Sequence, residues 1–182
     1  MHITTYTGKH IDPVNPEKDK IDVRDIAHAL SLLCRGNGHV KTFFSVGQHC
    51  INCALEAEAR GFEPRLVLAA LLHDASECYL SDVPRPFKAT LDGYKATEER
   101  MLSVIYESFL GSDLTEEEKK IIKVIDDDML YFDLRELLNE GMEREEPEVK
   151  IDIDYTFIPF EDVEEKYIEL YYIWKKKLEE RD

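Results

Sequence analysis

The sequence has no long apolar segment. No uninterrupted apolar span in its 182 residues approaches the length of about 20 that a membrane-spanning helix needs, and no signal-peptide-like apolar stretch stands at the start. We therefore expect a cytoplasmic protein with no membrane partner. In that reducing compartment the four cysteines are expected to be free thiols.

Positive charge is also scarce. The chain carries 23 Lys and Arg against 39 Asp and Glu, which gives a formal net charge of -16. Such a field repels a polyanion, and the basic residues do not cluster, so extended binding to nucleic acid is excluded. A small phosphorylated ligand is not excluded, because two or three local cations are enough to hold it.

Paired cysteine motifs are limited to Cys50-Ile-Asn-Cys53, which has the spacing of a metal or redox pair. No second cysteine pair completes a zinc site, and the motif lies inside a helical pattern. We interpret both residues as structural, half-buried thiols.

The chain shows no internal repeat, low-complexity tract or linker. With 43% hydrophobic residues it is long enough for one core, so residues 1–182 are predicted to form a single domain. Apolar residues recur at helical spacing, which predicts an all-α bundle. The alternating segment at 2–13 suggests a small N-terminal β-hairpin or strand. Helices are expected at about 22–34, from the N-cap Ser45 to Gly61, from Pro64 through Leu72, at about 93–111, from the capping box of Thr115 and Glu118 to Gly141, and at the carboxyl end.

Three further expectations concern the connections and the last helix. The two prolines of "DVPRPF" predict an irregular connection, and the alternating residues 149–155 could pair with the N-terminal strand. The last helix is amphipathic, and its aromatic side chains can pack on their own core or across a homodimer interface. These side chains are Tyr167, Tyr171, Tyr172 and Trp174.

A histidine and a carboxylate follow the most apolar segment of the chain. Residues 66–72 are all apolar, which predicts a helix enclosed by protein, and His73 and Asp74 come directly after them. A buried carboxylate without a partner costs several kcal/mol or more, so a base or a metal must compensate Asp74.

Two other helices offer partners for this pair. His49 points inward on the second helix, and Asp126 lies at the edge of the buried face of a later one, with Asp127 and Asp128 expected to point outward. Two imidazoles and two carboxylates suit a divalent metal. Spacing alone leaves open a hydrogen-bonded core histidine and a solvated run of aspartates.

The pattern H49…H73-D74…D126 resembles the signature of HD-domain phosphohydrolases, a helical, metal-dependent superfamily. The stretches "TYTGKHID", "DIAHALSLLCR", "FFSVGQH", "HDASE" and "SDVPRPFK" look like its bacterial and phage deoxynucleotidase-like subgroup, so the resemblance covers roughly residues 4–138. It favours "D126-DDMLYFDLREL" as the register of the last ligand, with Asp127 and Asp128 as alternatives.

The resemblance implies one divalent metal ion (Mn, Co, Mg, Fe, Ni or Zn) held by His49, His73, Asp74 and Asp126. The extra histidines expected of two-metal HD enzymes are missing. Catalysis would depend on Asp74 and on Glu77, which is placed to orient or deprotonate the attacking water or to protonate the leaving oxygen.

The resemblance also implies substrate contacts. Arg35 corresponds to a phosphate-binding arginine, Lys88 to a second cation, and Asp82 to a position near the sugar. Relatives can carry a bulky residue after the arginine where this chain has Gly36, which leaves a roomier pocket.

The expected activity is that of a metal-dependent phosphohydrolase acting on small nucleotides, with a 5′-nucleotidase on deoxynucleoside monophosphates as the first candidate. One alternative is a triphosphohydrolase, for which Lys41, Arg85 and Lys88 are the nearest cations. The other is a catalytically silent HD domain that binds a nucleotide or a partner.

Overall fold

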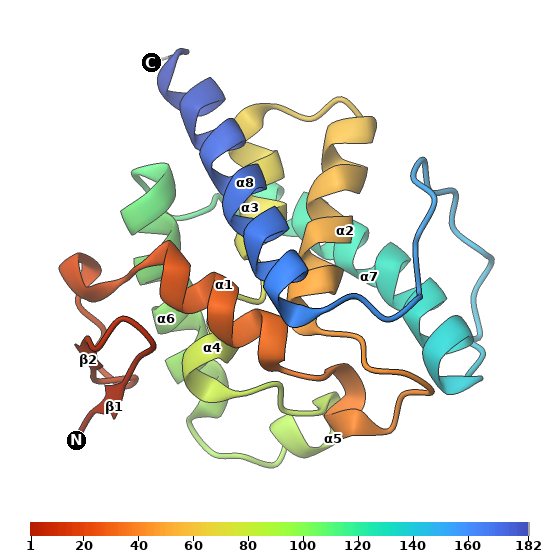
Figure 1. Ribbon diagram of the computed structural model, residues 1–182, viewed down its shortest axis with the longest axis horizontal. Helices are drawn as coiled ribbons and strands as arrows, with labels where there is room; N and C mark the ends of the chain where they lie inside the picture. Colours follow the sequence, from red (N-terminus) through yellow and green to blue (C-terminus); the bar gives the residue numbers. More distant parts are fainter. Residues whose placement is uncertain (182) are drawn as a thin grey trace.

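The computed structural model describes residues 1–181 and has a helical fold with a small N-terminal hairpin, as the sequence predicts (Figure 1). Strand β1 (Ile3–Thr4) pairs antiparallel with β2 (His10–Ile11). The helices are α1 (Val23–Leu32), α2 (Val46–Ala59), α3 (Pro64–Leu72), α4 (Glu77–Leu80), α5 (Arg85–Lys88), α6 (Tyr94–Leu110), α7 (Glu116–Leu138) and α8 (Phe160–Glu179), with short 3-10 turns η1 (Lys18–Lys20) and η2 (Arg35–Gly38). Within the described chain, no helix is long and apolar enough to cross a membrane.

Capping boxes begin α2 and α7, the one at Thr115 as predicted and the one at Ser45 where the sequence indicated only an N-cap. The Ser45 hydroxyl accepts from the Gln48 amide, and the Gln48 side chain accepts from the Ser45 amide. Thr115 and Glu118 form the same reciprocal pair at the start of α7. Each box satisfies two backbone amides that would otherwise lack a partner, and thereby fixes where α2 and α7 begin.

Helix α3 lies at the centre of the molecule, packed against α2 and α8 (Figure 1). Every side chain from Val67 to Leu72 is buried, which agrees with the uninterrupted apolar run. Three of the aromatic residues of α8, Tyr167, Tyr171 and Trp174, are buried against this core, whereas Tyr172 is exposed. The Tyr167 hydroxyl donates to the Leu71 carbonyl at 2.7 Å, so even the polar end of this buried side chain is satisfied.

The end of α7 differs from the prediction. The helix ends at Leu138, and Asn139 adopts a left-handed conformation with φ 54°, so Gly141 is not the residue that terminates it. Asparagine tolerates this conformation better than most residues because its short polar side chain can bond locally.

The alternating stretch at 149–155 forms no strand and does not pair with the N-terminal hairpin. Val149, Ile151 and Ile153 pack partly buried against the core. The Glu56 carboxylate accepts hydrogen bonds from the backbone amides of Lys150 and Ile151 at 2.9 and 3.1 Å. These two backbone amides therefore bond to a buried carboxylate on α2 and not to the carbonyls of a neighbouring strand.

The connection around the prolines contains a short helix, α5, although an irregular segment was expected. Pro84 caps this turn and Pro86 lies in its first turn, where a missing amide proton is tolerated. Helix α3, which leads to His73, does not continue to Glu77. It ends at Leu72, a turn follows, and Glu77 begins the separate four-residue helix α4.

We predict that Glu56→Ala lowers the free energy of unfolding by about 3 kcal/mol, because it leaves two backbone amides and the Arg60 guanidinium without their shared acceptor. Urea unfolding measures this change. Exposed Glu58→Ala is the matched control and should alter stability by less than about 0.5 kcal/mol. Equal effects of the two substitutions would contradict a structural role for Glu56.

Candidate metal centre and pocket

The four residues expected to bind a metal come together from three parts of the fold. His49 lies on α2, His73 and Asp74 follow the end of α3, and Asp126 lies on α7. Asp126 Oδ1 is 3.2 Å from His49 Nε2 and 3.7 Å from His73 Nε2. Asp74 Oδ2 is 3.3 Å from His73 Nε2 and 4.0 Å from His49 Nε2. The imidazole Nε2 atoms thus face both carboxylates.

The other nitrogen of each ring has its own partner, which orients the ring. His73 Nδ1 is 2.7 Å from the Ala70 carbonyl oxygen, an atom that can only accept a hydrogen bond. His49 Nδ1 is 2.8 Å from Asp133 Oδ2. A proton on each Nδ1 leaves both Nε2 lone pairs free to bind a metal.

Asp133 was not anticipated from the sequence. It lies two helical turns after Asp126 on α7, and its other oxygen accepts a hydrogen bond from the Tyr155 hydroxyl at 3.0 Å. The spacing of seven residues was the only available signal, because nothing in the sequence shows that Tyr155 and His49 lie beside it.

These residues fit a divalent cation. Among the residues that the structure describes, buried His73 Nε2 has no hydrogen-bond partner although it lies among charged groups. Two groups that include His73 have ligand atoms within 4.8 Å of one another and could hold a metal ion: His49 with Cys53, and Cys50 with Asp74. An ion with imidazole and carboxylate ligands would satisfy this nitrogen.

The charges of the four groups depend on one another. Burial alone would lower the pKa of His73, but the Asp74 carboxylate raises it, and the resulting pKa lies well above the usual value. Burial would raise the pKa of Asp126, but the hydrogen bond from His49 and the positive charge of the two imidazoles hold that pKa well below the usual value. Protons on the imidazoles therefore offset the buried negative charge, and a cation that replaces them would do the same.

The three consecutive aspartates of α7 point in different directions. Asp126 lines the pocket, and Asp127 lies toward Lys123 and Arg85 on the surface. Asp128 was expected to point outward, but it is buried and pairs with Arg60 and Arg144. Successive helical residues are about 100° apart, so one of three neighbours can face the site while another enters the protein on a different side.

The two motif cysteines are also more buried than expected. Cys50 is fully buried and Cys53 is 1% exposed, rather than half-buried. Both are free thiols, and Cys53 Sγ lies 3.5 Å from His49 Nε2. They therefore belong to the surroundings of the imidazoles.

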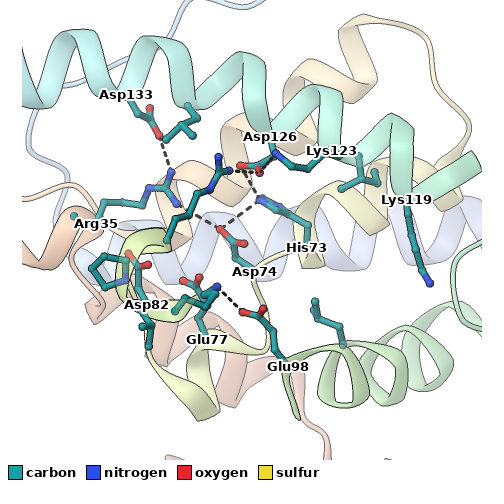
Figure 2. A pocket seen from close by; sticks show the side chains of 18 of the residues that line it. Arg35, His73, Asp74, Glu77, Asp82, Glu98, Lys119, Lys123, Asp126 and Asp133 are labelled. Atoms are coloured by element: carbon teal, nitrogen blue, oxygen red, sulfur yellow. Dashed lines mark hydrogen bonds and ion pairs between the residues drawn. The ribbon is translucent and has the colours of Figure 1, made fainter. Parts of the chain in front are cut away.

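A pocket of about 1040 Å³ opens beside the four groups (Figure 2). Three of the expected metal ligands, His73, Asp74 and Asp126, line this pocket. The expected catalytic residue Glu77 and the expected substrate-binding residues also line it, namely Arg35, Asp82 and Lys88. Figure 2 shows Arg35 beside Asp74, with the Glu77 and Asp82 carboxylates on the same side.

Arg35 lines the pocket and also pairs with two carboxylates beside the imidazoles. Its guanidinium lies 3.4 Å from Asp74 Oδ2 and 3.3 Å from Asp133 Oδ2. Gly36, which follows it, has φ 58°, in the left-handed region that glycine adopts readily. A Cβ at this position would make ordinary contacts with Val40 and Leu138, so the backbone conformation restricts substitution more than space does.

Glu77 is buried, and no described residue donates a hydrogen bond to its Oε2. Burial raises its pKa well above the usual value, and the nearby Asp74 and Asp82 carboxylates add to the effect. Burial likewise raises the pKa of Asp82. A carboxyl group of this kind keeps its proton to a higher pH than a free carboxyl group does, which suits it to proton transfer.

The outer part of the pocket carries more charge. Lys88 Nζ is 2.7 Å from Glu98 Oε1, a partner that the sequence did not suggest. Three further cations, Arg85, Lys119 and Lys123, also line the pocket. Lys41, considered from the sequence as a nearby cation, is not among the lining residues.

Comparison with known proteins finds similar sequences, and the two described below carry no named activity. A search against models of protein families gives no match. The chain is 43% identical over 110 residues to the uncharacterized protein YfdR of Escherichia coli K12, an alignment that covers 59% of this chain and 57% of YfdR. It is 35% identical over 126 residues to an uncharacterized protein of Rhodobacter capsulatus, which covers 66% of this chain and 64% of that protein. The chain therefore spans less than two thirds of the length of either relative.

We predict that Asp133→Asn weakens the binding of a divalent metal by about tenfold to a hundredfold, because the amide no longer favours a proton on His49 Nδ1. Calorimetric titration with Mn²⁺ measures the change. Glu136→Gln, at an exposed position one helical turn further on, removes the same charge and should leave the affinity unchanged. An unaltered affinity in Asp133→Asn would argue against this orienting role.

Proposed function

We propose that the chain is an HD-type, metal-dependent phosphohydrolase that acts on small nucleotides. The observation that carries the proposal is the meeting of His49, His73, Asp74 and Asp126, of which the last three line a pocket that also contains Arg35. The pattern of these residues resembles the HD signature, and their arrangement supports the same function. A helical bundle without such a function would not need this buried set of charges.

In this proposal the four ligands hold one divalent cation. When bound, such an ion lowers the pKa of a water molecule and polarises a phosphate oxygen. Arg35 binds phosphate oxygens through its planar guanidinium, and its contacts with Asp74 and Asp133 hold it in place for that task.

Glu77 supplies the proton transfer. Its buried carboxyl, with a raised pKa, lies in the same pocket and can take a proton from the attacking water or give one to the leaving oxygen. The absence of a hydrogen-bond donor at Oε2 among the described residues leaves that atom available to a reactant.

We propose deoxynucleoside monophosphates as the first substrate class. Arg35 is the most buried of the cations that contact the ligands, with its side chain 14% exposed against 60% for Arg85. The amine of Lys88 is already paired with Glu98, so the buried part of the site has charge enough for one phosphate group. Asp82 can bind a sugar hydroxyl. Gly36 leaves room around the sugar, so a preference for deoxyribose over ribose does not follow from bulk at this position.

A triphosphate is the second candidate, and one observation favours it. Arg85, Lys119 and Lys123 also line the pocket and could contact phosphates beyond the first. Figure 2 shows Lys119 and Lys123 on α7. Their side chains are engaged with neighbouring carboxylates, which a longer phosphate chain would have to displace.

The decisive experiment identifies the released product. The purified chain, with its metal content determined by elemental analysis, is incubated with deoxynucleoside mono- and triphosphates in Mn²⁺, Co²⁺ or Mg²⁺. We expect orthophosphate from the monophosphates. Intact triphosphate released from triphosphates would instead establish the second candidate. Metal binding without release of any phosphate product would leave a domain that binds nucleotides or partners without turnover.

We predict that Glu77→Gln slows turnover by about a hundredfold or more and leaves metal affinity unchanged, because the amide cannot exchange the proton. Steady-state kinetics and metal titration measure the two effects separately. Glu99→Gln is the control, because Glu99 lines the pocket but is exposed and pairs with Lys95. Loss of metal in Glu77→Gln would place Glu77 among the ligands.

A further inference from the structure

A thiol lies beside one of the two imidazoles, outside the pocket. Cys53 follows His49 by one turn of α2, and its Sγ atom is 3.5 Å from His49 Nε2. Neither residue lines the pocket, whereas His73, Asp74 and Asp126 do. His49, Cys53 and His73 are all buried, with ligand atoms within 4.8 Å of one another.

The separation of the sulfur and the nitrogen suits a shared ion. Zinc lies about 2.3 Å from a thiolate and about 2.1 Å from an imidazole, so two such ligands at a tetrahedral angle are about 3.6 Å apart. The distance between Cys53 Sγ and His49 Nε2 is 3.5 Å. His73 Nε2, which has no hydrogen-bond partner among the described residues, gives the set a second free nitrogen.

The thiol and the carboxylates compete for the same nitrogens. His49 Nε2 lies 3.2 Å from Asp126 Oδ1 as well as 3.5 Å from Cys53 Sγ. His73 can use only Nε2, since its Nδ1 is bonded to the Ala70 carbonyl. An ion bound through Cys53 therefore occupies both imidazoles, and a second ion cannot share them.

We propose that His49, Cys53 and His73 form a second, soft ligand set that binds a thiophilic divalent cation such as Zn²⁺ or Cd²⁺ and thereby excludes a hard cation from the oxygen-rich set. The thiol gives its proton to solvent when the sulfur binds the ion. Thiolate ligands favour such ions, whereas carboxylate and water favour Mg²⁺ and Mn²⁺. This inference rests on the proposed function in one respect, because the soft set and the proposed oxygen-rich set both use His49 and His73.

Cobalt titration tests the proposal directly. A thiolate bound to Co²⁺ gives a sulfur-to-cobalt charge-transfer band in the near ultraviolet, which imidazole and carboxylate ligands do not give. We expect this band in the unaltered chain and its loss in Cys53→Ser, together with at least about a tenfold loss of Cd²⁺ affinity and an unchanged Mn²⁺ affinity. Cys53→Ala is a second variant in case serine is poorly tolerated at this buried position.

Two cysteine substitutions serve as controls. Cys34→Ser changes a thiol that belongs to neither His/Cys group of the described structure. Cys50→Ser removes the thiol that is grouped with His73 and Asp74. Both variants should keep the charge-transfer band, and its loss in Cys50→Ser alone would overturn the assignment to Cys53.

A third variant separates this inference from the proposed function. Asp74→Ala removes a ligand from the oxygen-rich set only, so it should lose Mn²⁺ binding and keep the cobalt–thiolate band. Binding of Co²⁺ to the unaltered chain without the band would overturn the soft set and leave the proposed hydrolase intact. Nucleotide hydrolysis with no metal bound would instead contradict the proposed function.

Discussion

The attraction between two half-buried carboxylates and two buried imidazoles is the interaction on which the rest of the structure depends. Asp74 and Asp126 lie where burial opposes their charge, and the His49 and His73 rings are the groups that hold them ionised. Uncompensated, either carboxylate would destabilise the fold by several kcal/mol. The packing of α2, α3 and α7 around this cluster therefore has to satisfy charge as well as fill space.

The residues around the four groups are themselves paired with one another. Asp133 and the Ala70 carbonyl hold the rings, and Arg35 is paired with both Asp74 and Asp133. The cations Arg85 and Lys123 pair with Asp126 but are more exposed than Arg35. Arg35 shares its carboxylate partners with the imidazoles, so the proposed metal site and the proposed phosphate site would be linked.

Helical spacing and capping residues are local signals, and they predict most of the fold. Ser45, Pro64 and the capping box at Thr115 place the starts of three helices correctly, because each signal acts within one turn of chain. Contacts between distant segments are harder to foresee. His49 and Asp133 are 84 positions apart, and residues 149–155 alternate as a strand would although the Glu56 carboxylate is their partner. The same limit explains why the surroundings of Cys53 and the inward direction of Asp128 were not foreseen.

The site is divided between long and short elements. The four groups that face one another belong to helices packed in the core or to the residue directly after one, whereas Glu77, Asp82 and Lys88 lie on α4, α5 and the connection between them. That connection begins at Ser81, which has φ 71°. Insertions or replacements between residues 77 and 88 would change the shape of the pocket and leave the ring nitrogens where they are. In the proposed hydrolase, changes in one short surface segment would alter which substrates fit, while the groups proposed to hold the metal would stay as they are.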